Sequence, residues 1–161
     1  MTRRSVACAA MIMVAGVRAD AQHTHGQAEL DIGIDGKSGA MELRIPGEDL
    51  YGFEHLPRTP AERAQRDSAV AKLSSRASSL VQFDPSFGCT VTPGPVRFST
   101  GTHVEVSVRY TLLCRSAPIG RDIRFGVTSV FPSVRIVRVQ LVTETMQREV
   151  TITGDKGVVR P

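Results

Sequence analysis

Beyond its first 21 residues, the sequence has no apolar run long enough to cross a membrane, since a transmembrane helix needs about 20 consecutive apolar residues. It also has no block of basic residues and no aromatic stripe, which argues against binding to nucleic acid. We find no H-E-x-x-H motif, no nucleophile elbow, no glycine-rich phosphate loop and no Ser-His-Asp order that the spacing supports. These absences predict a soluble protein that is not an enzyme and that binds neither nucleic acid nor membranes in its mature form.

The first 21 residues have the pattern of a secretory signal peptide. Arg3 and Arg4 form a basic start, an apolar run covers residues 5–17, and Ala19-Asp20-Ala21 has the small-x-small form of a cleavage site. An apolar N-terminal element of a cytosolic domain is the alternative. Cleavage near Ala21 would leave residues 22–161 as a single domain, long enough for its own core. The three arginines and one aspartate lost with the signal would lower the formal charge from +4 to near +2.

Removal of this segment would take Cys8 with it and leave two cysteines, Cys89 and Cys114. An even count in an exported chain favours one disulfide. Two buried thiols or a thiolate metal site are the alternatives. However, no C-x-x-C spacing supports a metal site, and thiolates are poorly protected in an oxidising compartment. We therefore predict a Cys89–Cys114 disulfide that stabilises the fold by roughly 3–4 kcal/mol in the chain-entropy treatment.

Hydrophobic periodicity predicts an α+β fold, namely an antiparallel sheet of about six strands with a helical pair packed on one face. Residues 27–46 alternate between apolar and polar around the turn cluster 35–39, as in a hairpin. Shorter alternating runs predict strands near residues 104–110, 123–127, 137–141 and 150–152. Prolines and glycines over residues 85–95 indicate irregular chain between the helical and the strand-rich parts.

The helical part begins with a strong start signal at Thr59-Pro60-Ala61-Glu62. It combines a capping hydroxyl, a proline at the first helical position and a glutamate at the third. We expect a helix from Pro60 to about Leu73, interrupted at the serines that follow. A second short helix would then carry Leu80, Val81 and Phe83.

Three of the four histidines lie in two short segments, His23-Thr24-His25 and Gly52-Phe53-Glu54-His55. Imidazole is a frequent ligand of zinc. Side chains two residues apart on an extended chain point the same way. If the first strand continues back to His23, then His23 and His25 offer two nitrogen donors side by side on its polar face. A polar terminus whose histidines have no role is the alternative.

Other side chains could complete such a site. His55 is a candidate third ligand, or it could cap the helical layer through a hydrogen bond. Glu54 could bind metal or orient an imidazole through its free ring nitrogen, and the alternative is a solvated charge. His103, on the polar side of its strand, and Glu29, on the same strand face as His25, are further candidates for metal binding.

Several motifs occur together along the mature chain: His23-Thr24-His25-Gly26-x-Ala28-x-Leu30, Leu50-x-Gly52-Phe53-Glu54-His55-x-Pro57, paired cysteines, and Val130-Phe131-Pro132 before Val137-x-Val139-Gln140. In this combination the chain resembles the ZrgA-like zinc-binding periplasmic proteins over nearly its whole mature length. The resemblance implies a periplasmic protein that binds Zn²⁺ and supports zinc acquisition, with a zinc-uptake transporter component as a possible partner. A small disulfide-bonded interaction or assembly module without a metal role is the alternative function.

The chain departs from this family in one respect. Members commonly carry a long histidine-rich loop between the two cysteines, whereas residues 92–102 here contain no histidine. We therefore expect one divalent metal site and no bulk zinc reservoir. Copper or nickel could compete for the site, because imidazole ligands accept these ions too.

Overall fold

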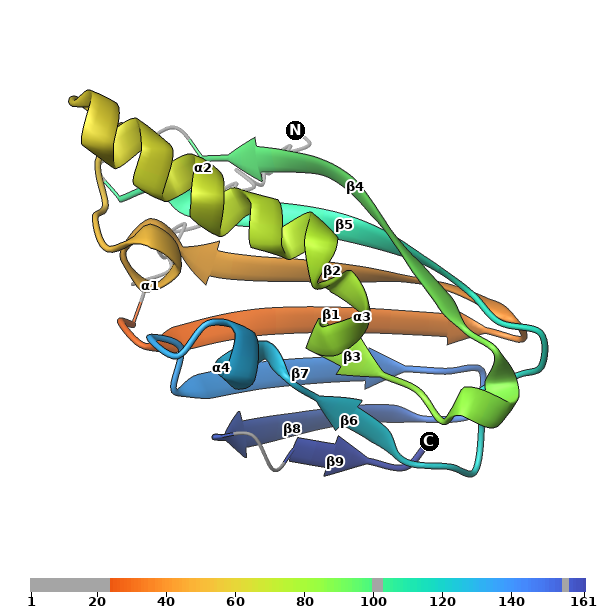
Figure 1. The fold of residues 1–161 in the computed structure, drawn as a ribbon. Helices are drawn as coiled ribbons and strands as arrows, with labels where there is room; N and C mark the ends of the chain where they lie inside the picture. The colour runs from red at the N-terminus through yellow and green to blue at the C-terminus, as the bar shows by residue number, and fades with distance from the viewer. Residues whose placement is uncertain (1–23, 100–102, 155–156) are drawn as a thin grey trace, which may run out of the picture.

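The computed structural model describes residues 24–99, 103–154 and 157–161 (Figure 1). Within these ranges the chain forms a six-stranded sheet of order β4-β5-β2-β1-β7-β8 and a three-stranded sheet of order β3-β6-β9. The strands are β1 (Gln27–Asp35), β2 (Ser38–Pro46), β3 (Val81–Gln82), β4 (Thr90–Phe98), β5 (Glu105–Leu113), β6 (Ile123–Phe125), β7 (Ile136–Val142), β8 (Gln147–Thr153) and β9 (Gly157–Val159). The helices are α1 (Gly47–Tyr51), α2 (Pro60–Ser75), α3 (Ala77–Leu80) and α4 (Val127–Val130), with a 3₁₀ turn at Pro85–Phe87.

The expected N-terminal hairpin is confirmed as β1 and β2, which pair antiparallel with Asp35 opposite Ser38. The alternation of apolar residues puts one face of each strand into the core, and Leu30, Ile32 and Leu43 are each only 1% exposed. Because side chains alternate between faces, the residues between them form a polar outer face. The same period buries every second residue of β5 and β7.

The six-stranded sheet is mixed, so the prediction of a purely antiparallel sheet is wrong. β1 pairs with β7 in parallel, with Leu30 opposite Val139, while the other pairs in this sheet are antiparallel. β5 and β7 run in the same direction, so the chain must cross back over one face between them, as parallel strands require. Residues 114–135 make this crossover and carry β6 and α4. Alternation within each strand contains no information about this return.

β4 occupies part of the segment that was predicted to be irregular chain, and that prediction is corrected here. Pro93 and Pro95 lie within β4, and the register with β5 shifts between Pro93 and Val96. The strand tolerates both prolines because it lies at the sheet edge, where a missing N–H removes few ladder bonds. Immediately before β4, Cys89 is bonded to Cys114 at the end of β5, which confirms the predicted disulfide.

The layer covering the sheet is more complex than the expected helical pair. Figure 1 shows α1, α2, α3 and α4 on one face of the six-stranded sheet, together with the small sheet that contains β6 and β9. α3 ends at Leu80, and the next two residues form β3 rather than continuing a second helix. The predicted capping box at the start of α2 is confirmed, since the Glu62 N–H donates to Thr59 Oγ1 and the Glu62 carboxylate accepts from the Thr59 N–H. Over the described ranges, no helix combines the length and apolar character needed to cross a membrane.

Candidate functional site

The turn that carries His25 precedes β1 and is not part of it. The strand begins at Gln27, whose N–H donates to the Thr24 carbonyl (3.2 Å), and Gly26 has a positive φ of 77°. The expected continuation of the strand back through His25 is therefore wrong, because a left-handed residue breaks the extended backbone. His23 lies outside the described residues.

Glu48 reaches the site from α1, the short helix that follows β2. Gly52 ends this helix with φ 93°, and its N–H donates to the Glu48 carbonyl (2.8 Å). Successive residues of a helix point about 100° apart. Glu48 therefore faces solvent while Asp49, its neighbour, points into the protein and is only 7% exposed.

Glu54 follows α1 in an irregular segment held against the start of β5. Its carbonyl accepts a hydrogen bond from Val104 N–H (3.0 Å). The Phe53 ring packs 4.6 Å from that of Tyr51 and stacks on His55 with 5.0 Å between ring centres. The Glu54 carboxylate extends toward His25 and His103.

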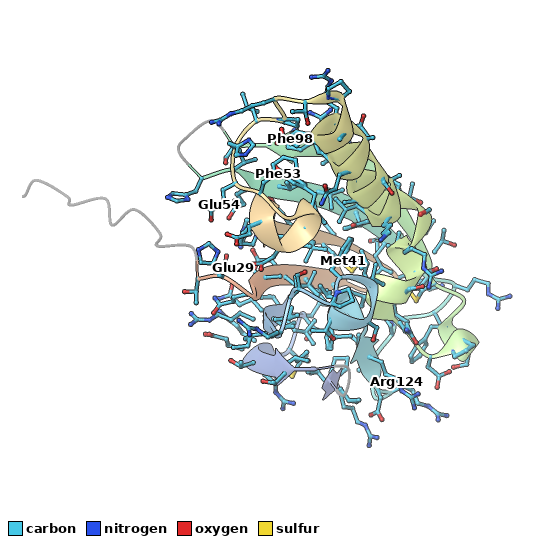
Figure 2. All side chains as sticks on the ribbon, turned by 60° about the vertical axis from the view of Figure 1, so that its left-hand side comes forward. Glu29, Met41, Phe53, Glu54, Phe98 and Arg124 are labelled. Atoms are coloured by element: carbon cyan, nitrogen blue, oxygen red, sulfur yellow. A yellow bond between two sulfur atoms is a disulfide. The ribbon has the colours of Figure 1, made fainter. Side chains whose placement is uncertain are left out.

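Four side chains from three parts of the chain meet here, and we call them the His–Glu cluster: His25, Glu48, Glu54 and His103. His25 Nδ1 lies 3.0 Å from Glu48 Oε2 and 3.5 Å from Glu54 Oε1. The other carboxylate oxygen of Glu54 contacts His103 Nδ1. One ligand atom each from His25, Glu48 and Glu54 lies within 4.8 Å of the other two. Figure 2 shows Glu54 on the side of the molecule where α1 lies, between Phe53 and Glu29.

The His–Glu cluster is open to solvent. The side chains of His25, Glu48 and His103 are 57%, 49% and 59% exposed, and that of Glu54 is 23% exposed. Two carboxylates beside two imidazoles give a locally negative surface that attracts cations. Nitrogen and oxygen donors of this kind suit Zn²⁺. The arrangement can therefore bind a divalent metal ion, and its exposure to solvent leaves a path for the ion to enter and leave.

The buried carboxylate of Asp49 lies beneath the His–Glu cluster and binds the backbone next to His25. It is the only buried charged side chain among the described residues, and its Oδ2 accepts the Gly26 N–H at 2.8 Å. Burial raises the pKa of the Asp49 carboxyl above its usual value, although the Gly26 N–H acts in the opposite direction. A buried carboxylate is thus joined to the residue next to His25.

Two other residues predicted from the sequence lie apart from the cluster. His55 stacks on Phe53, and its Nδ1 contacts the Leu56 carbonyl oxygen (2.9 Å). Glu29 forms an ion pair with Arg44 Nη2 (2.9 Å) on the polar face of the sheet. The structure does not bring either of them to His25.

Glu48 was missed by the sequence reasoning. Its signal was a pair of acidic residues, Glu48-Asp49, between the hairpin and Gly52-Phe53-Glu54-His55. The predicted hairpin could have identified it, because Glu29 lies opposite Arg44 and continuing that register past the strand ends places Glu48 opposite His25.

Comparison with protein families gives a match over the sequence that follows residue 21. A family model described as "ZrgA family zinc uptake protein" matches residues 22–161, a range that includes all four residues of the His–Glu cluster. Comparison with individual curated proteins gives no match.

Proposed function

We propose that this chain, which belongs to the ZrgA family of zinc uptake proteins, captures Zn²⁺ in the periplasm and supports zinc acquisition by passing the ion to a transporter component. The observation that carries the proposal is the convergence of His25, Glu48 and Glu54, with their ligand atoms within 4.8 Å of one another. The signal-like segment before residue 22 supports export.

The spacing of the three ligand atoms suits zinc. Zn–N and Zn–O bonds of about 2.0–2.2 Å in a tetrahedral site place neighbouring ligand atoms about 3.3–3.6 Å apart. His25 Nδ1 lies 3.0 Å from the nearest oxygen of Glu48 and 3.5 Å from that of Glu54. Small side-chain movements would therefore let all three atoms bind one ion.

A fourth ligand has two candidates in the chain. His103 already contacts Glu54 through its Nδ1, so it could bind the ion or orient the Glu54 carboxylate from behind. His23, two residues before His25, is the other candidate. Water would complete the coordination if neither binds.

The exposure of the cluster favours transfer of the ion over permanent storage. More than half of the His25 side chain is exposed, so a partner protein could approach the bound ion directly. Carboxylate ligands also hold zinc less firmly than thiolates, which favours release. A binding role without catalysis is part of the proposal, since catalytic zinc sites work best where water is excluded.

Competition titration tests the proposal. The mature chain is titrated with Zn²⁺ against a chromophoric chelator, beside the variants His25→Ala, Glu48→Gln and Glu54→Gln. Each variant should weaken binding by at least tenfold, because each removes one ligand or its charge. Glu29→Gln is the matched control: it neutralises an exposed carboxylate that is ion-paired to Arg44, and it should leave zinc affinity unchanged.

Three further variants separate the possible ligand sets. His55→Ala should leave affinity unchanged, because His55 is engaged with Phe53 and Leu56. His23→Ala and His103→Ala identify the fourth ligand. Tight binding that survives both His25→Ala and Glu54→Gln would refute the site, and no binding by the wild-type chain would refute the function.

A further inference from the structure

We propose that Asp49 is a positioning residue for the zinc site, holding the turn that carries His25 against α1 so that His25 and Glu48 face each other before zinc arrives. This inference rests on the zinc site proposed above. It assigns to Asp49 a role that is exerted through the backbone and not by contact with the ion.

The geometry places Asp49 between the two ligand-bearing segments. Its carboxylate accepts the N–H of Gly26, the residue after His25, while its own backbone neighbour is Glu48. The β1–β2 register brings His25 and Glu48, 23 residues apart in sequence, to the same end of the hairpin, and the 2.8 Å bond from Gly26 to Asp49 fixes the turn against α1. Because the bond is buried, water does not compete strongly for either partner.

Gly26 is held on its other side as well. Its carbonyl accepts the N–H groups of Arg135 (2.8 Å) and Ile136 (2.9 Å) at the start of β7. These two bonds hold the turn against the start of β7. Asp49 completes this arrangement from the side of α1.

Backbone hydrogen bonds position the other half of the cluster. The Gly47 N–H donates to the Val104 carbonyl (2.7 Å), and the Val104 N–H donates to the Glu54 carbonyl (3.0 Å). These bonds tie α1, Glu54 and the residue after His103 together. Asp49 differs from them because its contribution comes from a side chain, so a substitution can remove it selectively.

Asp49 does not fit a role as a ligand. Its side chain is buried and oriented toward Gly26. The three ligand atoms that lie close together belong to His25, Glu48 and Glu54. Substitution of residues that orient metal ligands from outside the coordination sphere commonly weakens metal affinity by about 10- to 100-fold.

The test compares Asp49→Ala and Asp49→Asn with wild type, using Zn²⁺ and a competing chelator. Asp49→Ala should weaken zinc binding by about 10- to 100-fold, because the turn carrying His25 loses its support. Asp49→Asn keeps an oxygen that can accept the Gly26 N–H and should recover most of that loss. Tyr110→Phe is the matched control, since it removes another buried side-chain hydrogen bond, from Tyr110 Oη to the Leu73 carbonyl (3.0 Å), and should leave affinity unchanged.

Two readouts separate positioning from general destabilisation. The visible spectrum of the protein loaded with Co²⁺ should change in Asp49→Ala and stay unchanged in Tyr110→Phe, because it reports ligand geometry. In the metal-free protein, hydrogen exchange at the Gly26 amide should accelerate in Asp49→Ala and remain slow in Asp49→Asn.

The outcomes distinguish this inference from the proposed function. Wild-type zinc affinity and an unchanged Co²⁺ spectrum in Asp49→Ala would overturn the positioning role while leaving the zinc site in place. Equal losses of affinity in Asp49→Ala and Tyr110→Phe would also overturn it, since the effect would then follow stability alone. Absence of zinc binding by wild type would overturn both proposals, whatever the Gly26 exchange rate.

Discussion

Removal of the Cys89–Cys114 disulfide should lower stability substantially while leaving zinc affinity intact. The bond joins residues 25 apart in sequence, immediately beside the Thr90–Leu113 pair of the β4–β5 hairpin. In Cys89→Ala/Cys114→Ala, the unfolded chain regains the conformational entropy that the disulfide-closed loop removes. The double substitution also avoids leaving a reactive thiol.

The size of the loss follows from the length of the loop. The chain-entropy relation for about 25 residues gives roughly 3.5 kcal/mol at 25 °C. An unfolding entropy of about 2.1 cal/mol/K per residue gives about 0.3 kcal/mol/K for a domain of about 140 residues. The melting temperature should therefore fall by about 12 °C.

Zinc affinity should stay unchanged when stability falls, because the disulfide and the His–Glu cluster lie at opposite ends of β5. Cys114 follows the last residue of the strand, whereas His103 precedes its first residue by two positions. Nine residues at about 3.4 Å each separate the ends by about 30 Å. The contacts of the His–Glu cluster therefore lie far from the bond.

Scanning calorimetry of residues 22–161, as wild type and as the double-alanine variant, measures the shift, and chelator competition measures zinc affinity in the same samples. Alkylation under non-reducing conditions should label neither cysteine of the wild type. A fall of less than about 3 °C would contradict the chain-entropy reasoning. A tenfold weaker zinc affinity in the folded variant would show that the site depends on the hairpin end that the disulfide closes.

Four further predictions concern the metal, the turn and, for the last two, the start of α2. Calorimetry should show one saturable phase with about one zinc per chain, and the affinity should decrease in acid, because protons compete with the ion for imidazole nitrogen; several additional micromolar sites would contradict this. Gly26→Ala should weaken zinc binding and lower the melting temperature, because φ is 77°, a conformation that residues with a Cβ rarely adopt; unchanged values for both would refute the strain argument. Thr59→Ala should cost about 1 kcal/mol in urea unfolding without affecting zinc. Hydrogen bonds from the backbone N–H groups of Arg58 and then Thr59 lower the pKa of Glu62. The Glu62 carboxylate should therefore stabilise the fold above the usual glutamate pKa, and this stabilisation should be lost as the pH falls through the lowered pKa. If the difference in unfolding free energy between wild type and Glu62→Gln does not vary with pH, the stabilising role of the Glu62 carboxylate is contradicted.

Much of the local structure could be predicted from the sequence because its signals act over a few residues. Alternation through Leu30 and Ile32 specifies a half-buried strand wherever that strand lies in the sheet. Thr59 and Glu62 satisfy helix N–H groups three residues away, so the start of α2 is encoded locally. The cysteine count predicted the disulfide, since the expected removal of Cys8 with the signal peptide would leave only one pairing.

Interactions between distant segments decided the rest. The parallel pairing of β1 with β7 and the place of β4 at the sheet edge depend on where residues 114–135 return the chain, which no periodicity records. The candidate site divides differently. The β1–β2 register alone carries Glu48 to His25, whereas tertiary packing brings Glu54 and His103 to the same place. His55, equally prominent in the sequence, stacks on Phe53 and lies outside the cluster. The two histidine segments thus indicated a metal-binding chemistry, and long-range packing selected which of the candidate side chains meet, because a metal site requires proximity in space.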